Sequence, residues 1–360
     1  MSAPAPPTDA AAHAAPRAPE AAPGRAPSLL VVIVNYASGG LVADCLASLA
    51  AERPAAHGWR VVVTDNGSPD DSAARIEGVI AERGYGAWCQ LQRLPRNGGF
   101  AYGNNAAIRP ALAAAAPPDF VLLLNPDTVV RPGAIDALLT FMVSHAAVGI
   151  AGSRLEDPDG TVQRSAFRFH GVASEFEHAM RLGPVSRCLA RHVVAPPAPA
   201  DAAPADWVAG ASMMIRRAVF EAVGLLDERY FMYFEEVDFC RRAQRAGWPT
   251  WYVPASRVVH LVGQTSGVTD TKRPRKRRPA YWFESRRLYF VTHLGGGRAA
   301  LADALWLAGY ALYRLRAAVT GREVSDPPRL WWDFLRHSTL VRAWAPRRRQ
   351  APACAGGAVS

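Results

Sequence analysis

The sequence predicts an α/β fold in which a mostly parallel, doubly wound central sheet is flanked by helices. Two observations indicate this fold: continuous apolar runs rich in β-branched residues, and helical spacing of apolar residues between those runs. Runs of the first kind are typical of strands buried on both faces. Strands that alternate with helices usually form a parallel sheet with helices on both sides. We therefore expect a sheet of this kind in the first part of the chain and a helical C-terminal extension after it.

The first third of the chain supplies four expected strands, most of them ending in a polar turn. The first is the run 28–36, and the spacing of Leu41, Leu46 and Leu49 predicts a helix after it. The remaining elements expected here are strands at 60–68, 90–94 and 120–124, with a helix at 104–115.

The pattern changes after residue 150. Residues 151–205 look irregular and are rich in proline near 195–204, so we expect an insertion there. A strand at 207–215 is expected to return to the core, followed by a helix at 238–246 and a short strand at 251–260. Residues past about 280 are expected to be helical.

Composition indicates a globular protein of a reducing compartment. Half of the 360 residues are hydrophobic, which is enough to bury a large core. The five cysteines show no CxxC spacing, which argues against a zinc site or a disulfide framework and fits the cytosol. The N-terminus lacks a basic start and an apolar segment, so no signal peptide is expected. Residues 1–27, mostly Ala and Pro, are expected to form a disordered tail.

The net charge of +10 is concentrated in two basic runs, 272–278 and 347–349. Such runs contact nucleic acid or an anionic membrane, or are simply solvated loops. The apolar segment 299–319 contains three aromatic residues and is interrupted by three charged ones. It therefore favours a helix that lies in the membrane interface over one that crosses it. A helix that only packs on the domain is the alternative.

Polar residues at the ends of the first strands indicate a ligand site. Asn35 and Asp65 are expected at strand ends, where a nucleotide base and ribose could dock in the crevice of the sheet. The segment 65–68 is also an ordinary turn sequence. The loop 97–105 combines three glycines, which allow close backbone approach, with asparagines that cap a helix or donate to a ligand. No GxGxxG follows the first strand, which disfavours a nicotinamide enzyme.

Asp127 closes the fourth expected strand. Pro126 favours extended geometry at Asn125, so the strand should end abruptly with Asp127 in a turn. A hard divalent cation that keeps several waters and binds substrate phosphates needs only one or two such carboxylates. Such a cation would neutralise charge on a departing diphosphate. Alternatively, Asp127 caps a helix that starts after Pro132.

A second carboxylate cluster, Glu235, Glu236 and Asp238, begins the helical pattern near residue 238. Their mutual repulsion must be relieved by a cation, an arginine or a raised pKa. One of them could act as a general base toward a hydroxyl group within hydrogen-bond reach. His260 ends a later strand, and it either has a structural role or contacts a metal or phosphate.

Taken in order, these motifs resemble those of inverting family 2 glycosyltransferases with a GT-A fold, and in particular the bacterial rhamnosyltransferase type. The resemblance covers about residues 28–265. It is carried by the motifs at 32–36, 65–68, 97–105, 124–127, 210–217 and 227–242 and by His260.

The resemblance implies a role for each motif. The expected nucleotide-binding residues are Asn35, Asp65, Asn66, Asn97, Gly98, Gly99, Asn104 and Asn125. Asp127 and His260 would bind the metal, Mg²⁺ or Mn²⁺, and Gly210, Ala211 and Glu235 would line the acceptor or sugar pocket. The family's Glu-Asp-x-Asp motif is Glu-Glu-Val-Asp here, so the position of the base holds Glu236, and Asp238 is the alternative.

We therefore expect a metal-dependent inverting glycosyltransferase, with dTDP-rhamnose as the favoured donor by resemblance. Its acceptor would be a cell-envelope or lipid-linked glycan at the cytoplasmic face of the membrane, with 272–278 and 299–319 near an anionic surface. A sugar-nucleotide-binding protein without turnover, or a nucleotidyltransferase, is the alternative. A nucleic-acid-binding protein is disfavoured, and its affinity would fall steeply with salt.

These expectations divide the chain into four parts. They are a tail (1–27), a GT-A domain (28–265) with a nucleotide-binding half (28–130) and an acceptor-side half (131–265), a basic and helical extension (266–346) and a second disordered tail (347–360).

Overall fold

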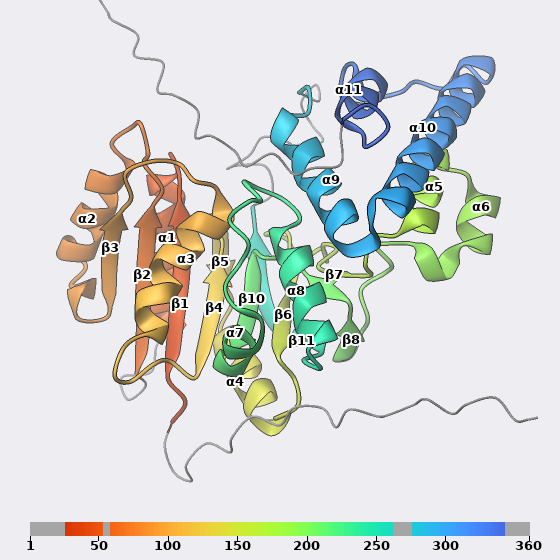
Figure 1. Ribbon diagram of the computed structural model, residues 1–360. Helices are drawn as coiled ribbons and strands as arrows, with labels where there is room; N and C mark the ends of the chain where they lie inside the picture. Colours follow the sequence, from red (N-terminus) through yellow and green to blue (C-terminus); the bar gives the residue numbers. More distant parts are fainter. Residues whose placement is uncertain (1–25, 53–57, 262–275, 343–360) are drawn as a thin grey trace, which may run out of the picture.

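The computed structural model describes residues 26–52, 58–261 and 276–342 of the chain. Its core is one large mixed sheet covered by helices on both faces (Figure 1). In order across the sheet, the strands are β3 (Cys89–Arg93), β2 (Trp59–Asp65), β1 (Leu29–Asn35), β4 (Phe120–Leu124), β10 (Ser212–Arg216), β6 (Ile150–Glu156), β11 (Thr250–His260) and β5 (Thr128–Val130). In addition, β8 (Ala203–Ala205) pairs with β11, and β7 (Ala166–Phe167) pairs with β9 (Trp207–Val208) in a separate ribbon.

Helices cover both faces of the sheet. Because successive side chains of a strand point to opposite faces, alternate residues of β1 contact different sets of helices. Odd-numbered residues of β1, such as Val31 and Ile33, pack against α1 (Gly39–Glu52), α2 (Ser72–Glu82) and α4 (Ala134–Ser144). Even-numbered ones, such as Val32, face α3 (Phe100–Leu112), α7 (Arg217–Val223) and α8 (Glu235–Arg245). Because both faces are covered, β1 is apolar from Leu29 to Val34, as buried parallel strands usually are, and only its last residue, Asn35, is polar.

The sheet is parallel in its first half and mixed in its second. β1 pairs in parallel with β2 and β4, and β2 with β3, as expected. β10 runs antiparallel to both of its neighbours, β4 and β6, whereas β11 is parallel to β6 and antiparallel to β5. The reversed β10 places its first residue, Ser212, opposite Leu124, the last residue of β4. The turn before β10 therefore lies at the carboxyl end of β4.

The expectation of an irregular segment at 151–205 was wrong. It contains most of the central strand β6, as well as α5 (Val172–Met180), α6 (Gly183–Cys188) and a 3₁₀ turn (Ala190–His192). β6 is difficult to recognise in the sequence because it contains Glu156, and a buried charged residue is unusual in a strand. Arg131 and Arg257 make it tolerable by donating to its two carboxylate oxygens at 3.1 and 2.9 Å.

Two further boundaries differ from the expectation. α3 begins at Phe100 instead of near 104, directly after the glycine pair of the loop. α8 begins at Glu235 instead of 238, so its acidic residues occupy the first turn, where the helix dipole favours negative charge. The predicted strand at 207–215 is divided into β9 and β10 by a turn at 209–211.

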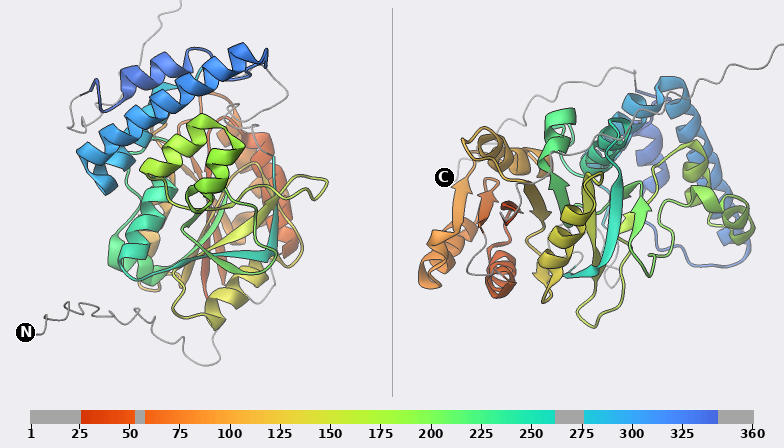
Figure 2. Two further views of the ribbon diagram at one scale, coloured as in Figure 1. Left: turned by 90° about the vertical axis from the view of Figure 1, so that its right-hand side faces the viewer. Right: turned by 90° about the horizontal axis from the view of Figure 1, so that it is seen from below.

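The C-terminal helices α9 (Ala280–Leu294), α10 (Gly296–Val319) and α11 (Leu330–His337) lie together with α5 and α6 at one end of the sheet (Figure 2). Aromatic residues of α9, α10 and α11, among them Phe283, Trp306 and Phe334, form a separate cluster there with Ala179 of α5. Within the described residues, no helix has the length and apolar character needed to cross a membrane. Residues 272–275 of the basic run at 272–278, the run at 347–349 and almost all of the predicted tails lie outside the described residues, whereas 276–278 are described.

Candidate active site

A pocket of about 310 Å³ lies at the carboxyl edge of the sheet. We call it the sheet-edge pocket. The end of β1, the residues after β4, the turn before β10, the start of α8 and the end of β11 all contribute to it. The predicted site residues that line it are Asn66, Asn97, Gly99, Asn125, Asp127, Gly210, Ala211, Glu235, Glu236 and His260. Residues almost 200 positions apart in the sequence therefore meet at one edge, as α/β folds place their ligand sites.

Asn35 and Asp65 lie beneath this pocket and form a closed hydrogen-bond network. They are directly opposite each other in the β1–β2 register, and the Asn35 Nδ2 donates to the Asp65 carboxylate at 2.7 Å. The hydroxyl and backbone N–H of Ser68 also donate to Asp65, at 2.5 and 3.2 Å. Because both residues are buried, they shape the floor of the site. Tyr36, which follows Asn35 and is 42% exposed, reaches the pocket instead.

Asn66 fixes the glycine loop that forms the next wall. Its Nδ2 donates to the Asn97 side chain at 3.1 Å and to the Gly99 carbonyl at 3.0 Å. The Gly98 N–H donates back to the Asn66 Oδ1 at 3.3 Å. Gly99 has a φ of +91°, and a Cβ there would lie 1.9 Å from the Phe231 carbonyl oxygen. Only glycine therefore permits this loop to dock on the segment that leads into α8.

Asn104 lies elsewhere than predicted. Since α3 already begins at Phe100, Asn104 occupies the second turn of the helix and is buried. Its Nδ2 donates to the Phe100 carbonyl at 2.9 Å. It is not among the residues that line the sheet-edge pocket. The structure thus corrects its assignment from nucleotide contact to support for the loop.

Asp127 and His260 lie side by side in the lining of the pocket. Asp127 follows Pro126 and precedes β5, so it does not cap a helix, and the next helix, α4, begins only at Ala134. The β5–β11 pairing places His260 opposite Thr128, and the His260 Nε2 lies 3.5 Å from the Asp127 Oδ1. The Leu261 N–H donates to the Asp127 carbonyl at 2.9 Å, which fixes the backbone there.

The chemistry of this pocket fits a divalent cation shared with a substrate. Among the described residues, its lining carries the carboxylates of Asp127, Glu235 and Glu236 and the imidazole of His260, with no Lys or Arg. A diphosphate placed there would be repelled unless a cation lay between. One carboxylate and one imidazole leave most positions of Mg²⁺ or Mn²⁺ to water and phosphate oxygens. In the described ranges, no group of three His, Cys, Asp or Glu residues could form a complete protein cage for a metal.

A strained turn presents the acidic pair at the start of α8. Tyr233 and Phe234 both have a φ of +68°, which costs about 1–2 kcal/mol for each residue that is not glycine. The turn leads directly into Glu235 and Glu236, whose side chains line the pocket. Consecutive residues in this conformation are typical of functional sites, where the surrounding structure maintains the strain.

Burial makes this acidic pair unusually hard to ionise. The Oε2 atom of each glutamate is buried without a hydrogen-bond partner among the described residues. Burial raises the pKa of Glu236 to about 7. Burial, together with the charge of Glu236, raises the pKa of Glu235 well above its usual range. The pair therefore retains a proton near neutral pH, and Glu236 has the pKa that a general base needs.

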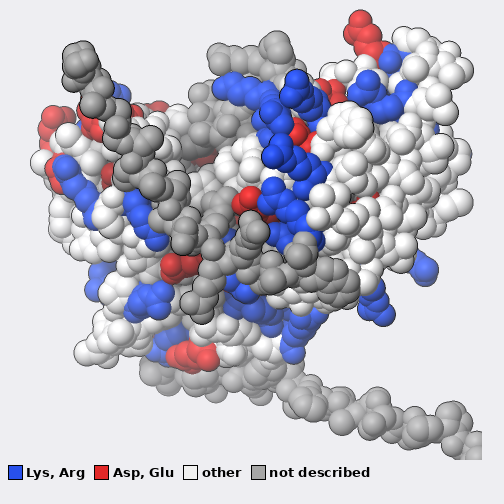
Figure 3. Space-filling view, turned by 45° about the horizontal axis from the view of Figure 1, so that its top comes forward, with Lys and Arg blue, Asp and Glu red and all other residues white. Residues whose placement is uncertain are grey.

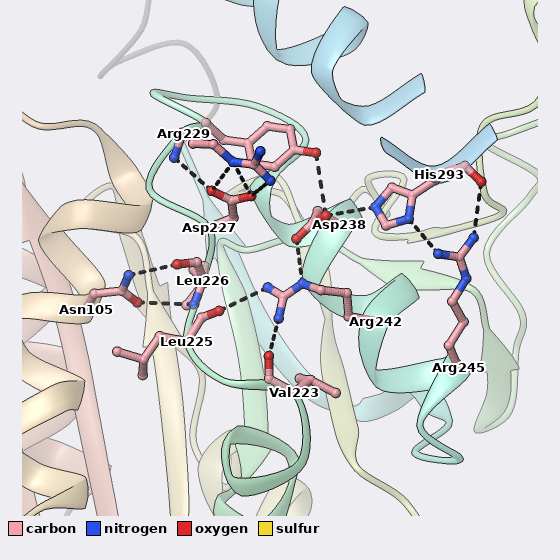
Figure 4. Close-up of polar contacts among 11 residues, drawn as sticks. Asn105, Val223, Leu225, Leu226, Asp227, Arg229, Asp238, Arg242, Arg245 and His293 are labelled. Carbon is pink, nitrogen blue, oxygen red and sulfur yellow. Dashed lines mark hydrogen bonds and ion pairs between the residues drawn. The ribbon is translucent and has the colours of Figure 1, made fainter. Parts of the chain in front are cut away.

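Asp238 lies two residues further along the same helix and, unlike the glutamate pair, has hydrogen-bond donors around its carboxylate (Figure 4). It accepts from His293 Nε2 at 2.7 Å and from Arg242 Nε at 2.8 Å. Burial favours a higher pKa, but the His293 hydrogen bond and the Arg242 charge outweigh it, so the pKa of Asp238 is lowered. The His293 Nδ1 accepts from Arg245, so the imidazole presents its Nε2–H to Asp238 (Figure 4).

These surroundings favour Glu236 over Asp238 as the base. Asp238 is 1% exposed, is not part of the pocket lining, and is already held by a histidine and an arginine. It anchors α9 to α8 through His293. The aromatic residues Tyr36, Phe100 and Tyr233 of the pocket were not predicted as site residues. The position of Tyr36, directly after the polar end of an apolar strand, was the available signal in the sequence.

Comparison with known proteins identifies the family to which the chain is similar. Residues 26–279 match the family model described as glycosyltransferase like family 2. The N-acetylglucosaminyl-diphospho-decaprenol L-rhamnosyltransferase of Mycobacterium tuberculosis is 32% identical over 255 residues, covering 66% of this chain and 78% of the relative. Rhamnosyltransferase WbbL of Escherichia coli is 31% identical over 173 residues, covering 45% of this chain and 60% of the relative.

Among solved structures, GalNAc-T7 with UDP, GalNAc and Mn²⁺ superposes with a TM-score of 0.55 at 14% sequence identity. The match covers 82% of this chain and 55% of that one, so the chain spans about half the length of this neighbour. At this identity the likeness shows the fold.

Proposed function

Because this chain belongs to glycosyltransferase family 2, it is a glycosyltransferase, and we propose that it transfers a sugar with inversion from a nucleotide-sugar donor to a hydroxyl group of a glycan. One observation carries the proposal: the sheet-edge pocket brings the Asp127–His260 pair and the Glu235–Glu236 pair together. The first pair suits a metal-bound diphosphate, and the second suits removal of a proton.

Each pair has a defined task in this reaction. Asp127 and His260 would hold the divalent cation, which supplies positive charge to the departing diphosphate. The ionised Glu236 accepts the proton of the acceptor hydroxyl as the new glycosidic bond forms. Glu235 stays protonated, so the pocket carries one negative charge less beside the diphosphate. An inverting transfer needs only one base, opposite the leaving group, by analogy with inverting hydrolases.

The favoured donor is dTDP-rhamnose, and the favoured acceptor is a lipid-linked or cell-envelope glycan. Two relatives named rhamnosyltransferases support the donor. The acceptor in the name of the mycobacterial relative, a sugar diphosphate on a decaprenol chain, supports the acceptor class. This proposal places the protein at the cytoplasmic face of the cell membrane.

An exposed apolar stripe on α10 supports contact with that membrane. Its large side chains, Leu301, Leu312, Leu315 and Val319, are 51%, 50%, 63% and 80% exposed, at helical spacing. Only alanines stand at the exposed positions between them on this face. The exposed Arg298, Arg314 and Arg322 flank the stripe, and Figure 3 shows Lys and Arg beside a broad uncharged surface. Apolar faces flanked by arginine lie in the interface of anionic bilayers.

Flotation with vesicles tests the membrane contact. We expect the wild type to bind vesicles that contain an anionic lipid, and the double variant Leu312→Asp, Leu315→Asp to bind at least about tenfold more weakly. Val143→Asp, which changes an exposed valine on α4, is the matched control and should bind normally. Equal binding of all three proteins, or a dimer in solution that the double variant dissociates, would overturn the assignment of the stripe to a membrane.

Analysis of the reaction products tests the proposed transfer. The purified protein is incubated with dTDP-rhamnose or with uridine-diphospho-sugars, a prenyl-linked N-acetylglucosaminyl diphosphate and Mg²⁺ or Mn²⁺. We expect a nucleoside diphosphate and an elongated glycan, both dependent on the cation. Release of pyrophosphate would indicate a nucleotidyltransferase instead. Metal-dependent binding of the donor without any product would indicate a binding protein.

A further inference from the structure

A second cavity, of about 740 Å³, lies between α5 and the C-terminal helices α9, α10 and α11. We call it the C-terminal cavity. It is larger than the sheet-edge pocket, and its volume is within the range of about 300–1,000 Å³ that is usual for small-molecule sites. None of the residues predicted from the sequence as site residues lines it. Its aromatic lining consists of Phe167, Trp207, Phe234, Trp282 and Trp306.

We propose that the C-terminal cavity binds sugar units of the acceptor glycan and presents them to Glu236. This inference rests on the proposed glycosyltransferase function and adds a binding site for the acceptor to it.

The two cavities are separated only by thin stretches of chain. Phe234 lines the C-terminal cavity, whereas its neighbours Tyr233 and Glu235 line the sheet-edge pocket. The positive φ angles at Tyr233 and Phe234 produce the turn that divides these side chains between the two sites. Residues 207–209 also contribute to both cavities. Trp207 lines the C-terminal cavity, and Ala209 lines the sheet-edge pocket. The chain segment that carries the proposed base therefore also contributes to the C-terminal cavity.

The aromatic lining suits the apolar C–H faces of sugar rings. The rings of Phe167 and Trp207 are stacked, with centroids 4.1 Å apart and planes 16° apart. His170 extends this aromatic surface toward Phe234, with ring centroids 5.1 Å apart. Trp207 is fixed by its indole N–H, which donates to the Arg168 carbonyl at 2.9 Å. Rigid aromatic surfaces of this kind bind ligands with little loss of conformational entropy.

Polar groups around the rim suit sugar hydroxyls more than a lipid chain. Glu177, His178 and Asp326 line the cavity together with the aromatic residues. His178 is exposed at this rim, and its imidazole nitrogens can form hydrogen bonds with sugar hydroxyls. The carboxylates of Glu177 and Asp326 already accept from Ser186 and Arg181, and each can accept further hydrogen bonds from sugar hydroxyls, which a hydrocarbon chain cannot donate.

The charges of the cavity are largely balanced internally, which disfavours a diphosphate as its occupant. Arg181 lies 2.9 Å from Asp326, and Arg286 lies 2.8 Å from Glu175. The Arg278 guanidinium is stacked over the Trp282 ring, 4.2 Å from its centroid. An amphipathic, uncharged ligand such as a sugar matches this lining better than an anion does.

An obstructing variant tests the assignment with little risk to folding. Ala195 is exposed and lines the cavity, so Ala195→Trp narrows the cavity without removing a buried group. Ala200→Trp, at an exposed alanine five residues later that does not line the cavity, is the matched control. The acceptor probe is N-acetylglucosaminyl diphosphate on a short prenyl chain.

We expect Ala195→Trp to raise the KM for the acceptor probe by about tenfold or more, with the KM for the donor unchanged. Trp282→Leu should also raise the KM for the acceptor probe. Trp282→Phe, which keeps an aromatic ring, should retain most of the acceptor affinity of the wild type. Ala200→Trp should match the wild type. An acceptor KM in Ala195→Trp within twofold of the control would overturn the assignment, even if all variants transfer sugar.

Equilibrium binding of the probe, followed by tryptophan fluorescence without donor, separates this inference from the proposed function. If the wild type binds the probe and Ala195→Trp binds it about tenfold more weakly, the cavity assignment stands even when no transfer is detected. If the wild type transfers sugar but both proteins bind the probe equally, the cavity assignment fails and the proposed function stands. Absence of probe binding by the wild type also overturns the cavity assignment.

Discussion

The strand-end residues beneath the sheet-edge pocket and the acidic start of α8 in its lining are built in opposite ways. At the strand ends, Asn35, Asp65 and Ser68 satisfy one another with short hydrogen bonds. At the start of α8, Glu235 and Glu236 each keep a buried carboxylate oxygen that has no hydrogen-bond partner among the described residues, after two strained residues. The first region is internally satisfied and the second is not, a difference expected where function overrides stability.

The same contrast appears within α8. Glu236 and Asp238 are two residues apart and both carry carboxylates. Burial without a partner raises the pKa of Glu236 to about 7, whereas His293 and Arg242 hold the pKa of Asp238 below its usual value. A carboxylate that already has two partners stabilises the fold, and one without a partner is available for chemistry.

The largest expected effect comes from Asp127→Asn. Removing the charge of the proposed metal ligand should lower turnover by about 10²–10³-fold, because the departing diphosphate loses its cation. Donor binding, measured by isothermal titration, should no longer depend on Mn²⁺. The control is Asp44→Asn, at a carboxylate of α1 that does not line the pocket. Cation-dependent donor binding that survives in Asp127→Asn would show that Asp127 is not a metal ligand.

Asp238→Asn should mainly reduce stability. It leaves Arg242 and His293 without their buried anion, which costs about 3 kcal/mol in the free energy of unfolding. Urea denaturation at pH 7 measures this loss. Enzyme that remains folded should retain its donor affinity, since Asp238 does not line the pocket. A variant of normal stability that cannot turn over would instead return Asp238 to the role of base.

The double variant Glu235→Gln, Glu236→Gln should raise the free energy of unfolding, whereas Asp238→Asn lowers it. This gain should appear only above acidic pH. A carboxyl group whose pKa is raised on folding stabilises the protein below its unfolded pKa, near 4.5, and this contribution is lost as the pH rises through about 7. Without metal, the variant should equal the wild type at pH 4.5 and exceed it by about 3 kcal/mol at pH 8. Parallel stability profiles for the two proteins between these pH values would show that the pair is not buried as described.

Ser68→Ala should have the smallest effect. It removes the hydroxyl that donates to Asp65 at 2.5 Å, and Asp65 keeps the Asn35 contact. We expect a loss of about 1 kcal/mol in stability and a change in the KM for the donor of less than about threefold. Thermal denaturation and steady-state kinetics measure these two quantities. A loss of turnover as large as that of Asp127→Asn would mean that the strand-end network takes part in the chemistry.

The sequence predicts the first half of the fold well, because β1, β2 and β4 are apolar runs that match their position in the core. Asp127 and His260 were also singled out from the sequence, because Asp127 comes shortly after β4 and His260 ends β11, and their role as metal ligands stays a prediction. β6 was missed, because the ion pairs that make Glu156 acceptable come from distant parts of the chain.

The contrast between Glu236 and Asp238 could not be predicted from the sequence for a similar reason. Three carboxylates in four residues look equivalent there, and the partner that distinguishes Asp238 is His293, 55 residues away. The C-terminal cavity likewise exists only after α9–α11 pack on α5. Tertiary contacts of this kind decide the role of a residue without changing its local pattern.

The measurement that tests the account most directly compares Glu236→Gln with Glu221→Gln, at an exposed glutamate of α7. Donor affinity and turnover are measured for both variants at pH 8 with Mn²⁺. We predict that Glu236→Gln binds the donor within about twofold of the control, but turns over about 10²–10⁴-fold more slowly, as expected after loss of a general base. Turnover of Glu236→Gln at the rate of the control would contradict the account, because Glu236 would then not be the base.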